Sequence, residues 1–97
     1  MFTILIHEEA EEEIRSTAFY YESIRAGRGD IFLQGLSEAL EQVKRHPLAW
    51  ATFEDEYRRY LMPHFPYGII YRIEEDFIYV LAVMNLHRKP GYWLDRT

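Results

Sequence analysis

Apolar residues repeat at helical spacing in the first half of the chain and at strand spacing in the second half. The run Phe2 to Ile6 is apolar and β-branched and is followed by charged residues, so it predicts a short, largely buried strand. The next apolar residues are spaced three or four positions apart: Ala10, Ile14, Ala18, Tyr21 and Ile24. This spacing predicts an amphipathic α-helix from about His7 to Ala26.

A second amphipathic helix follows after a short connection. Gly27 is the expected C-cap of the first helix, and Asp30 is the expected N-cap of the second. The apolar stripe of the second helix consists of Leu33, Leu36, Leu40 and Val43, with Phe32 and Ala39 beside it. This helix should end at Arg45–His46, because the residue before Pro47 disfavours helical geometry. Two such helices with few residues between them predict an antiparallel hairpin that covers one face of a sheet.

The C-terminal half predicts three strands joined by tight turns. Their ranges are 57–62, 67–73 and 77–84, and the last is almost continuously apolar, as expected for a strand with neighbours on both sides. Residues 48–56 predict a loop with Trp50 and Phe53 against the core, and Tyr92–Trp93 are expected near the surface. The predicted architecture is β-α-α-β-β-β, an α+β fold with an antiparallel meander, and the pattern leaves the strand order open.

The composition favours a single domain spanning residues 1–97. Hydrophobic residues make up 48% of the chain and aromatic residues 16%, which is enough for a core without covalent cross-links. The chain has no Cys, which excludes disulfides and a cysteine nucleophile and fits a reducing compartment. No signal-peptide pattern occurs, and no apolar run reaches the roughly 20 residues of a membrane span. We therefore expect a cytoplasmic protein with no membrane partner.

The net charge and the spacing of motif residues exclude several classes of binding site and enzyme. The net charge of −5 argues against non-specific nucleic-acid binding, which needs a basic surface. The glutamates between Glu8 and Glu13 predict a solvated helix start that matches the helix dipole, in preference to a metal site. The histidines lack the HExxH spacing of a zinc enzyme, and the chain has no P-loop, GxGxxG or GxSxG motif. No metal and no cofactor are therefore expected.

Three segments of the C-terminal half carry a family resemblance. They are Arg59–Leu61, FPYGIIYRI at 65–73 and IYVLAVMNLHRKPGYW at 78–93. Together with the preceding helix hairpin they resemble toxins of the RelE/ParE superfamily, most of all the branch of plasmid-stabilisation proteins. The resemblance covers almost the whole chain. It implies the toxin of a bacterial type II toxin–antitoxin module, held in a hetero-oligomer by an antitoxin whose C-terminal segment orders on binding.

The resemblance implies one of two mechanisms. RelE-like members are ribosome-dependent endoribonucleases that cut messenger RNA, whereas ParE-like members poison DNA gyrase and need not be enzymes. Metal-free RNA cleavage requires a base, an acid and cations around the phosphate. The matching cations are Arg58 or Arg59, Arg72 and Arg88, and the matching proton-transfer groups are His87 and Tyr92. Each of these residues could instead be an ordinary surface or packing residue. The nuclease hypothesis therefore depends on the group converging on the polar face of the sheet.

Two departures from the RelE-like pattern favour the ParE-like mode. Only Lys44 and Lys89 are lysines, so a Lys-rich phosphate cradle is missing, and Asn85 stands where many relatives carry His. The expected partner-binding residues are Arg58, Arg59, Arg72, Arg88 and Trp93. Open edges at the first strand and the outer strand of the meander would suit an antitoxin, with its acidic residues facing three of these arginines (58, 72 and 88). A third hypothesis is a toxin fold that has lost toxicity and only binds its partner.

Overall fold

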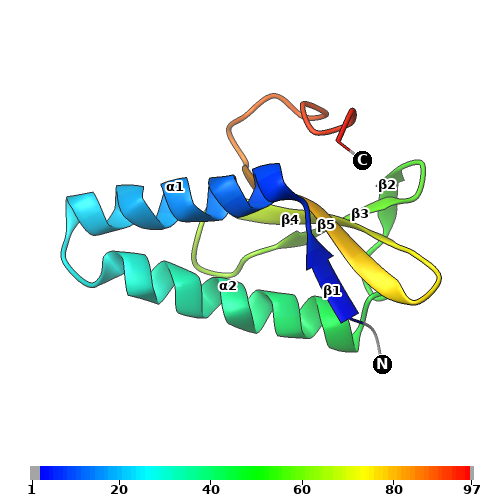
Figure 1. The fold of residues 1–97 in the computed structure, drawn as a ribbon, viewed down its shortest axis with the longest axis horizontal. Helices are drawn as coiled ribbons and strands as arrows, with labels where there is room; N and C mark the ends of the chain where they lie inside the picture. The colour runs from blue at the N-terminus through cyan, green and yellow to red at the C-terminus, as the bar shows by residue number, and fades with distance from the viewer. Residues whose placement is uncertain (1–2, 97) are drawn as a thin grey trace.

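The computed structural model describes residues 3–96, which form a helix hairpin and one sheet (Figure 1). The elements in chain order are β1 (Thr3–Ile6), α1 (Glu8–Ile24), α2 (Arg28–Arg45), β2 (Thr52–Glu54), β3 (Tyr57–Leu61), β4 (Tyr67–Ile73) and β5 (Phe77–Asn85). The predicted α+β architecture is confirmed, with β2 as an additional short strand. No helix in the described part of the chain is long and apolar enough to cross a membrane.

The sheet has the strand order β1-β5-β4-β3-β2. β1 runs parallel to β5, with Thr3 opposite Phe77, and β5, β4, β3 and β2 form antiparallel pairs. β5 therefore lies inside the sheet, as its apolar run predicts. β1 is an edge strand in which Leu5 is 48% exposed, so the prediction of a largely buried strand is wrong. Alternate side chains of a half-covered edge strand face solvent. Phe2, which the prediction included in this strand, lies outside the described residues.

β2 occupies part of the segment that the sequence predicts as a loop. It pairs with the start of β3, with Thr52 opposite Arg58. A strand of three residues is too short to show a periodic pattern, which explains the miss. Trp50 lies against the core, as expected, with its ring centroid 4.6 Å from that of Tyr60. Phe53 also packs against a core residue, with its ring centroid 5.8 Å from that of Trp93, although its side chain is 44% exposed.

The helix hairpin is capped differently from the prediction. Arg25 is the C-cap of α1, and Gly27 is the N-cap of α2 with a left-handed φ of 93°. Asp30 lies inside the first turn of α2 and is not its N-cap. The capping acceptor comes from α1 instead: the Glu22 carboxylate accepts hydrogen bonds from the backbone N–H groups of Gly27 and Gly29. The acceptor lies five and seven positions before the N–H groups that it caps, outside the usual N-cap position, so the standard capping pattern does not reveal it.

The core between the hairpin and the sheet is built on aromatic rings. Tyr21 and Phe32 lie 5.7 Å apart in a stacked arrangement, and Phe65 and Tyr67 meet both of them. Leu36 and Val43 of the predicted stripe of α2 are buried, but Leu33 is 41% exposed, and Phe32, expected beside the stripe, is completely buried. Contacts among rings at these distances add to the free energy of burial. The core on this face of the sheet is larger than the core on the opposite face.

Candidate functional site

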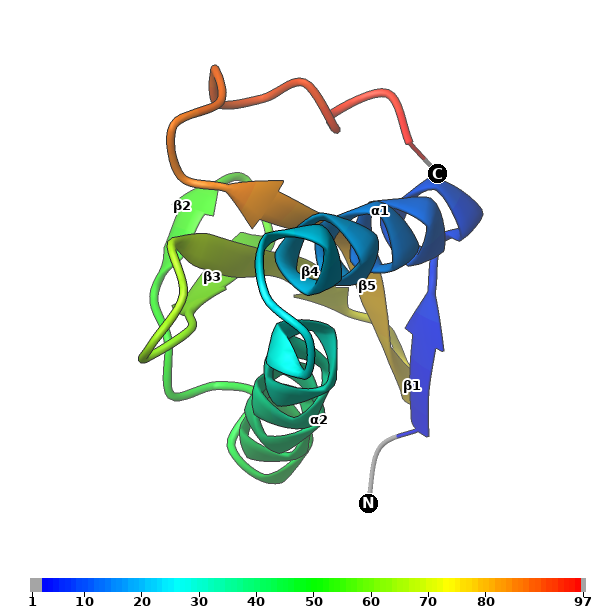
Figure 2. The ribbon, with the colours of Figure 1, turned by 90° about the vertical axis from the view of Figure 1, so that its left-hand side faces the viewer.

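The C-terminal segment, residues 86–96, crosses the face of the sheet opposite α2 (Figure 2). Trp93 is completely buried there and forms a second core cluster with Ile70, Ala82 and Met84. Its ring centroid lies 4.8 Å from that of Tyr57 on β3. The expectation that Trp93 lies near the surface is therefore wrong, because both faces of β4 and β5 are apolar and both need cover. In this position the Trp93 side chain offers no surface to a partner.

Glu13 of α1 ties the C-terminal segment to the helix. Its carboxylate accepts hydrogen bonds from the Tyr92 hydroxyl at 2.8 Å and from both terminal nitrogens of Arg96 at 3.1 and 3.0 Å. The side chains of Glu13 and Arg96 are only 15% and 9% exposed. The prediction of a solvated acidic helix start holds for residues 8, 9, 11 and 12, which are exposed, but is wrong for Glu13.

The same ion pair caps an open stretch of β5. β1 pairs only with residues 77–80 of β5, so the backbone edge that follows has no neighbouring strand. The backbone N–H of Val83 donates to Glu13 at 3.0 Å, and Arg96 Nη1 donates to the Leu81 carbonyl at 2.9 Å. Buried backbone groups need such partners, because leaving them unpaired costs about 1–3 kcal/mol each. Glu13 and Arg96 therefore pair with each other and also satisfy backbone groups at the open edge of β5.

The protonation states of Tyr92 and Arg96 favour their contacts with Glu13. Burial raises the pKa of Tyr92 well above its usual value, and the hydrogen bond to Glu13 adds to the shift, so the phenol keeps its proton. Burial alone would lower the pKa of Arg96, but the hydrogen bonds and negative charge of Glu13 outweigh it and raise that pKa. Arg88 lies 3.6 Å above the Tyr92 ring and 3.7 Å from the Glu13 carboxylate. Tyr92 thus acts as a hydrogen-bond donor between cations.

A sequence signal for Glu13 exists, although its role was not predicted. Glu13 stands three positions after Ala10 and four before Thr17, and both of these residues are buried. A carboxylate on that buried helix face needs a cation. The identity of the cation carries no comparable signal, because Arg96 lies far away in the sequence, beyond the segment of the family resemblance.

Of the three candidate arginines of the sheet, Arg58 lies on one face, and Arg59 and Arg72 lie on the other. Arg58 pairs across the strands with Tyr71, whose ring belongs to the core under the helices, and it donates to the Trp50 carbonyl at 2.6 Å. Arg72 follows Tyr71 in β4 and therefore points to the opposite face. There it forms an ion pair with Glu74, hydrogen bonds with Tyr57 and stacks over the Tyr79 ring at 5.2 Å.

Arg59 and His87 are more exposed and stand apart from these residues. Arg59 lies beside Phe53, with its guanidinium carbon 5.5 Å from the ring centroid. His87 lies in the turn after β5, where its backbone N–H donates to the Asn85 side chain at 2.8 Å. Within residues 3–96 the His87 imidazole forms no hydrogen bond or ion pair. Of the candidate nuclease residues, Arg88 and Tyr92 are in direct contact, and among the described residues no hydrogen bond or ion pair joins Arg58, Arg59, Arg72 and His87 to one another.

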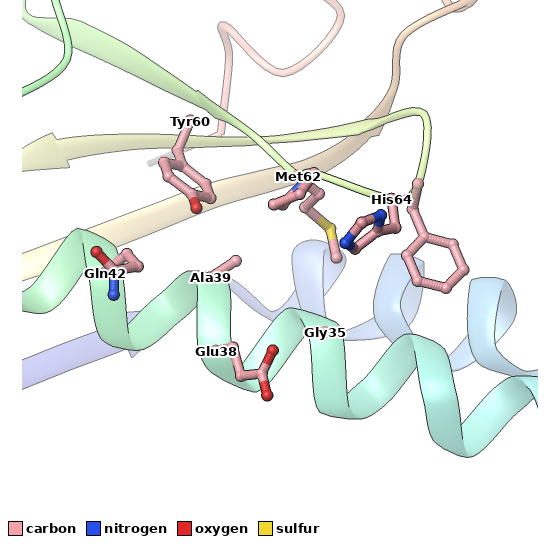
Figure 3. A pocket seen from close by; sticks show the side chains of 9 residues that line it. Gly35, Glu38, Ala39, Gln42, Tyr60, Met62 and His64 are labelled. Carbon is pink, nitrogen blue, oxygen red and sulfur yellow. The ribbon is translucent and has the colours of Figure 1, made fainter.

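A separate pocket of about 340 Å³ lies between α2 and the connection from β3 to β4 (Figure 3). Tyr60, Met62 and His64 are directed from the sheet side toward the helix. The remaining lining residues are Gly35, Glu38, Ala39, Gln42, Pro63 and Phe65. None of the candidate site residues from the sequence lines this pocket. Among residues 3–96, no group of three or more His, Asp or Glu side chains is arranged to hold a metal ion.

Comparison with known proteins identifies the family. Residues 4–90 match the family of ParE toxins of the type II toxin–antitoxin system parDE. A solved structure described as the chromosomal ParDE toxin–antitoxin system from P. aeruginosa superposes with a TM-score of 0.69. It is 14% identical and the match covers 90% of this chain and 98% of that one, which supports the fold. A search of curated protein sequences finds no significant match. Because the family match spans most of the chain, the protein belongs to the ParE toxin family of type II toxin–antitoxin systems.

Proposed function

We propose that this toxin acts in the bacterial cytoplasm by binding and inhibiting DNA gyrase and has no ribonuclease activity. The observation that carries the proposal is the separation of the candidate catalytic residues. Metal-free RNA cleavage needs an acid, a base and phosphate-binding cations within hydrogen-bond reach of one substrate. Arg58 and Arg72 point to opposite faces of the sheet, and His87 is apart from both.

The protonation states also disfavour proton transfer at this site. A general acid–base group works best when its pKa is near the pH of the reaction. Tyr92 has its pKa raised by burial and by its hydrogen bond to Glu13, which is a move away from neutrality. Its contacts are those of a structural residue that holds the C-terminal segment on α1.

We further propose that a cognate antitoxin neutralises the toxin in a hetero-oligomer. The structural neighbour is described as a ParDE toxin–antitoxin system, and two sheet edges, β1 and β2, are open among the described residues. Open edges accept an added strand. Acidic antitoxin residues would contact Arg58, Arg72 and Arg88, with Arg59 beside them, whereas the buried Trp93 takes no part in the contact. An antitoxin affinity unchanged in the triple variant Arg58→Ala, Arg72→Ala, Arg88→Ala would contradict the charge pairing.

The test of the proposed target is a DNA supercoiling assay with purified gyrase and the purified toxin. Inhibition that accumulates cleaved DNA, and that disappears when antitoxin is added, is the expected result. His87→Ala should inhibit as well as wild type, because the proposal gives this imidazole no role. A parallel reaction with ribosomes and messenger RNA tests the alternative. Transcript cleavage that is lost in His87→Ala, with gyrase unaffected, would establish the RelE-like mechanism instead.

A further inference from the structure

The pocket between α2 and the β3–β4 connection has an exposed polar rim, formed by Glu38, Gln42 and His64, to which the proposed function gives no role. We propose that it binds an arginine side chain presented by a partner polypeptide. In this arrangement Glu38 pairs with the guanidinium, the Tyr60 ring stacks on it, and the aliphatic stem lies along Met62 (Figure 3). Because the gyrase proposal uses none of these residues, the pocket can be tested independently of the target.

Several polar side chains that line this pocket have no hydrogen-bond or ion-pair partner in the described part of the chain. Within residues 3–96, the side chains of Glu38, Gln42 and His64 form no hydrogen bond or ion pair. Two other exposed carboxylates have a partner on their own helix, Glu12 with Arg15 and Glu41 with Arg45, whereas Glu38 has none among the described residues. Glu38 is therefore a free carboxylate at the rim of an apolar hollow. A ligand that enters must satisfy it or leave it desolvated and unpaired.

Gly35 keeps the pocket open at a cost to the helix. It lies in the interior of α2, where Gly is less favourable than Ala. A Cβ at this position would lie 3.5 Å from the Phe65 ring and 3.7 Å from the Met62 methyl group, which are ordinary contact distances. Alanine would therefore fit, would favour the helix and would fill part of the hollow. The glycine thus preserves space that folding does not require.

Arginine fits the lining better than other side chains do. Its planar cation can stack on an aromatic ring and form a two-point contact with a carboxylate, while its stem covers apolar surface. An acidic or phosphorylated ligand would face Glu38 and a chain of net charge −5. A purely apolar side chain would cover Met62 and Phe65 but give the polar rim no partner. The cavity of about 340 Å³ is large enough for the whole side chain.

The test uses N-acetyl-arginine N-methylamide as the probe and the citrulline analogue as its uncharged isostere. Titration followed by amide NMR should shift the signals of Gly35 and Ala39 and saturate. The citrulline compound should bind about fivefold more weakly, the range of an exposed ion pair. Glu38→Gln should remove that difference. Glu41→Gln, a neighbouring carboxylate on α2 that does not line the pocket, should preserve it.

Gly35→Ala supplies a second variant that is expected to fold. It should abolish the shifts while leaving the remaining spectrum of α2 intact, because its Cβ meets neighbours without a clash. Equal binding of the arginine and citrulline compounds would overturn the proposal in favour of an uncharged apolar groove. Binding unaffected by Gly35→Ala, or no shift at the pocket amides at saturating probe, would overturn it as well.

Discussion

The two faces of the sheet are covered in different ways. On one face, α1 and α2 bury a cluster of aromatic rings in which Phe32 is completely enclosed. On the other face lies an irregular segment, residues 86–96 (Figure 2). It buries Trp93 and is held in place by the ion pair between Glu13 and Arg96. The first cover depends on apolar area, and the second depends on one ring and a few polar contacts. The segment should therefore open at a lower free energy than the helix hairpin.

The largest expected effects come from removing a buried ring on each face. Phe32→Ala and Trp93→Ala should each lower the free energy of unfolding by about 3–5 kcal/mol in urea titrations. Phe32→Ala should weaken hydrogen-exchange protection throughout the molecule. Trp93→Ala should also release the segment, so amides of residues 86–96 should exchange much faster than those of α2.

A matched control exists for the tryptophan. The buried Trp93 Nε1 has no hydrogen-bond acceptor among the described residues. Trp93→Phe keeps a ring and removes this unsatisfied donor, so it should cost less than about 1.5 kcal/mol. Equal losses in the phenylalanine and alanine variants would contradict the view that ring burial holds the segment.

The next largest effect concerns the ion pair. Glu13→Gln leaves Arg96 buried beside a neutral amide and weakens the capping of β5, so unfolding should become easier by about 2–3 kcal/mol. Glu12→Gln is the matched control, because Glu12 pairs with Arg15 on the exposed surface. Its cost should stay below about 1 kcal/mol. Similar losses for the two variants in thermal or urea unfolding would show that the segment does not depend on Glu13.

The smallest effect is a dependence on alkaline pH that compares the two faces. Burial raises the pKa of Tyr71 on the helix side to about 12, and burial also raises the pKa of Tyr92 on the other side. A raised tyrosine pKa stabilises the fold fully below the unfolded value of about 10 and loses this contribution as pH rises through the folded value. At pH 11 each tyrosine should lose less than about 1 kcal/mol after allowance for solvent screening.

Two single variants separate these contributions. Tyr71→Phe and Tyr92→Phe should each reduce the steepness with which the free energy of unfolding falls between pH 9 and pH 11. The Tyr92 variant should act mainly on the exchange of residues 86–96. A slope unchanged in both variants would mean that neither phenol titrates with the fold.

The helix-covered face could be predicted from the sequence, and the other face could not. Helical spacing and alternating strands placed both helices and the meander because those elements bury periodic apolar faces. The cap from Glu22 comes from the preceding helix rather than from the N-cap position of α2, so the usual capping pattern does not predict it. The pairing of Glu13 with Arg96 joins residues distant in the sequence and has no local pattern. The candidate nuclease residues were identified by type, but the sequence could not show that Arg58 and Arg72 point to opposite faces.

Induction of the toxin in a bacterial host, alone and together with its neighbouring gene, would distinguish gyrase inhibition from messenger-RNA cleavage. Plasmid supercoiling, DNA breaks, messenger-RNA integrity and growth would be followed together. We expect growth arrest with broken DNA and intact transcripts, the same arrest with His87→Ala, and relief by the co-expressed partner. Arrest with cleaved transcripts and intact DNA, abolished by His87→Ala, would contradict this expectation, and unimpaired growth would remove toxicity from this member of the family.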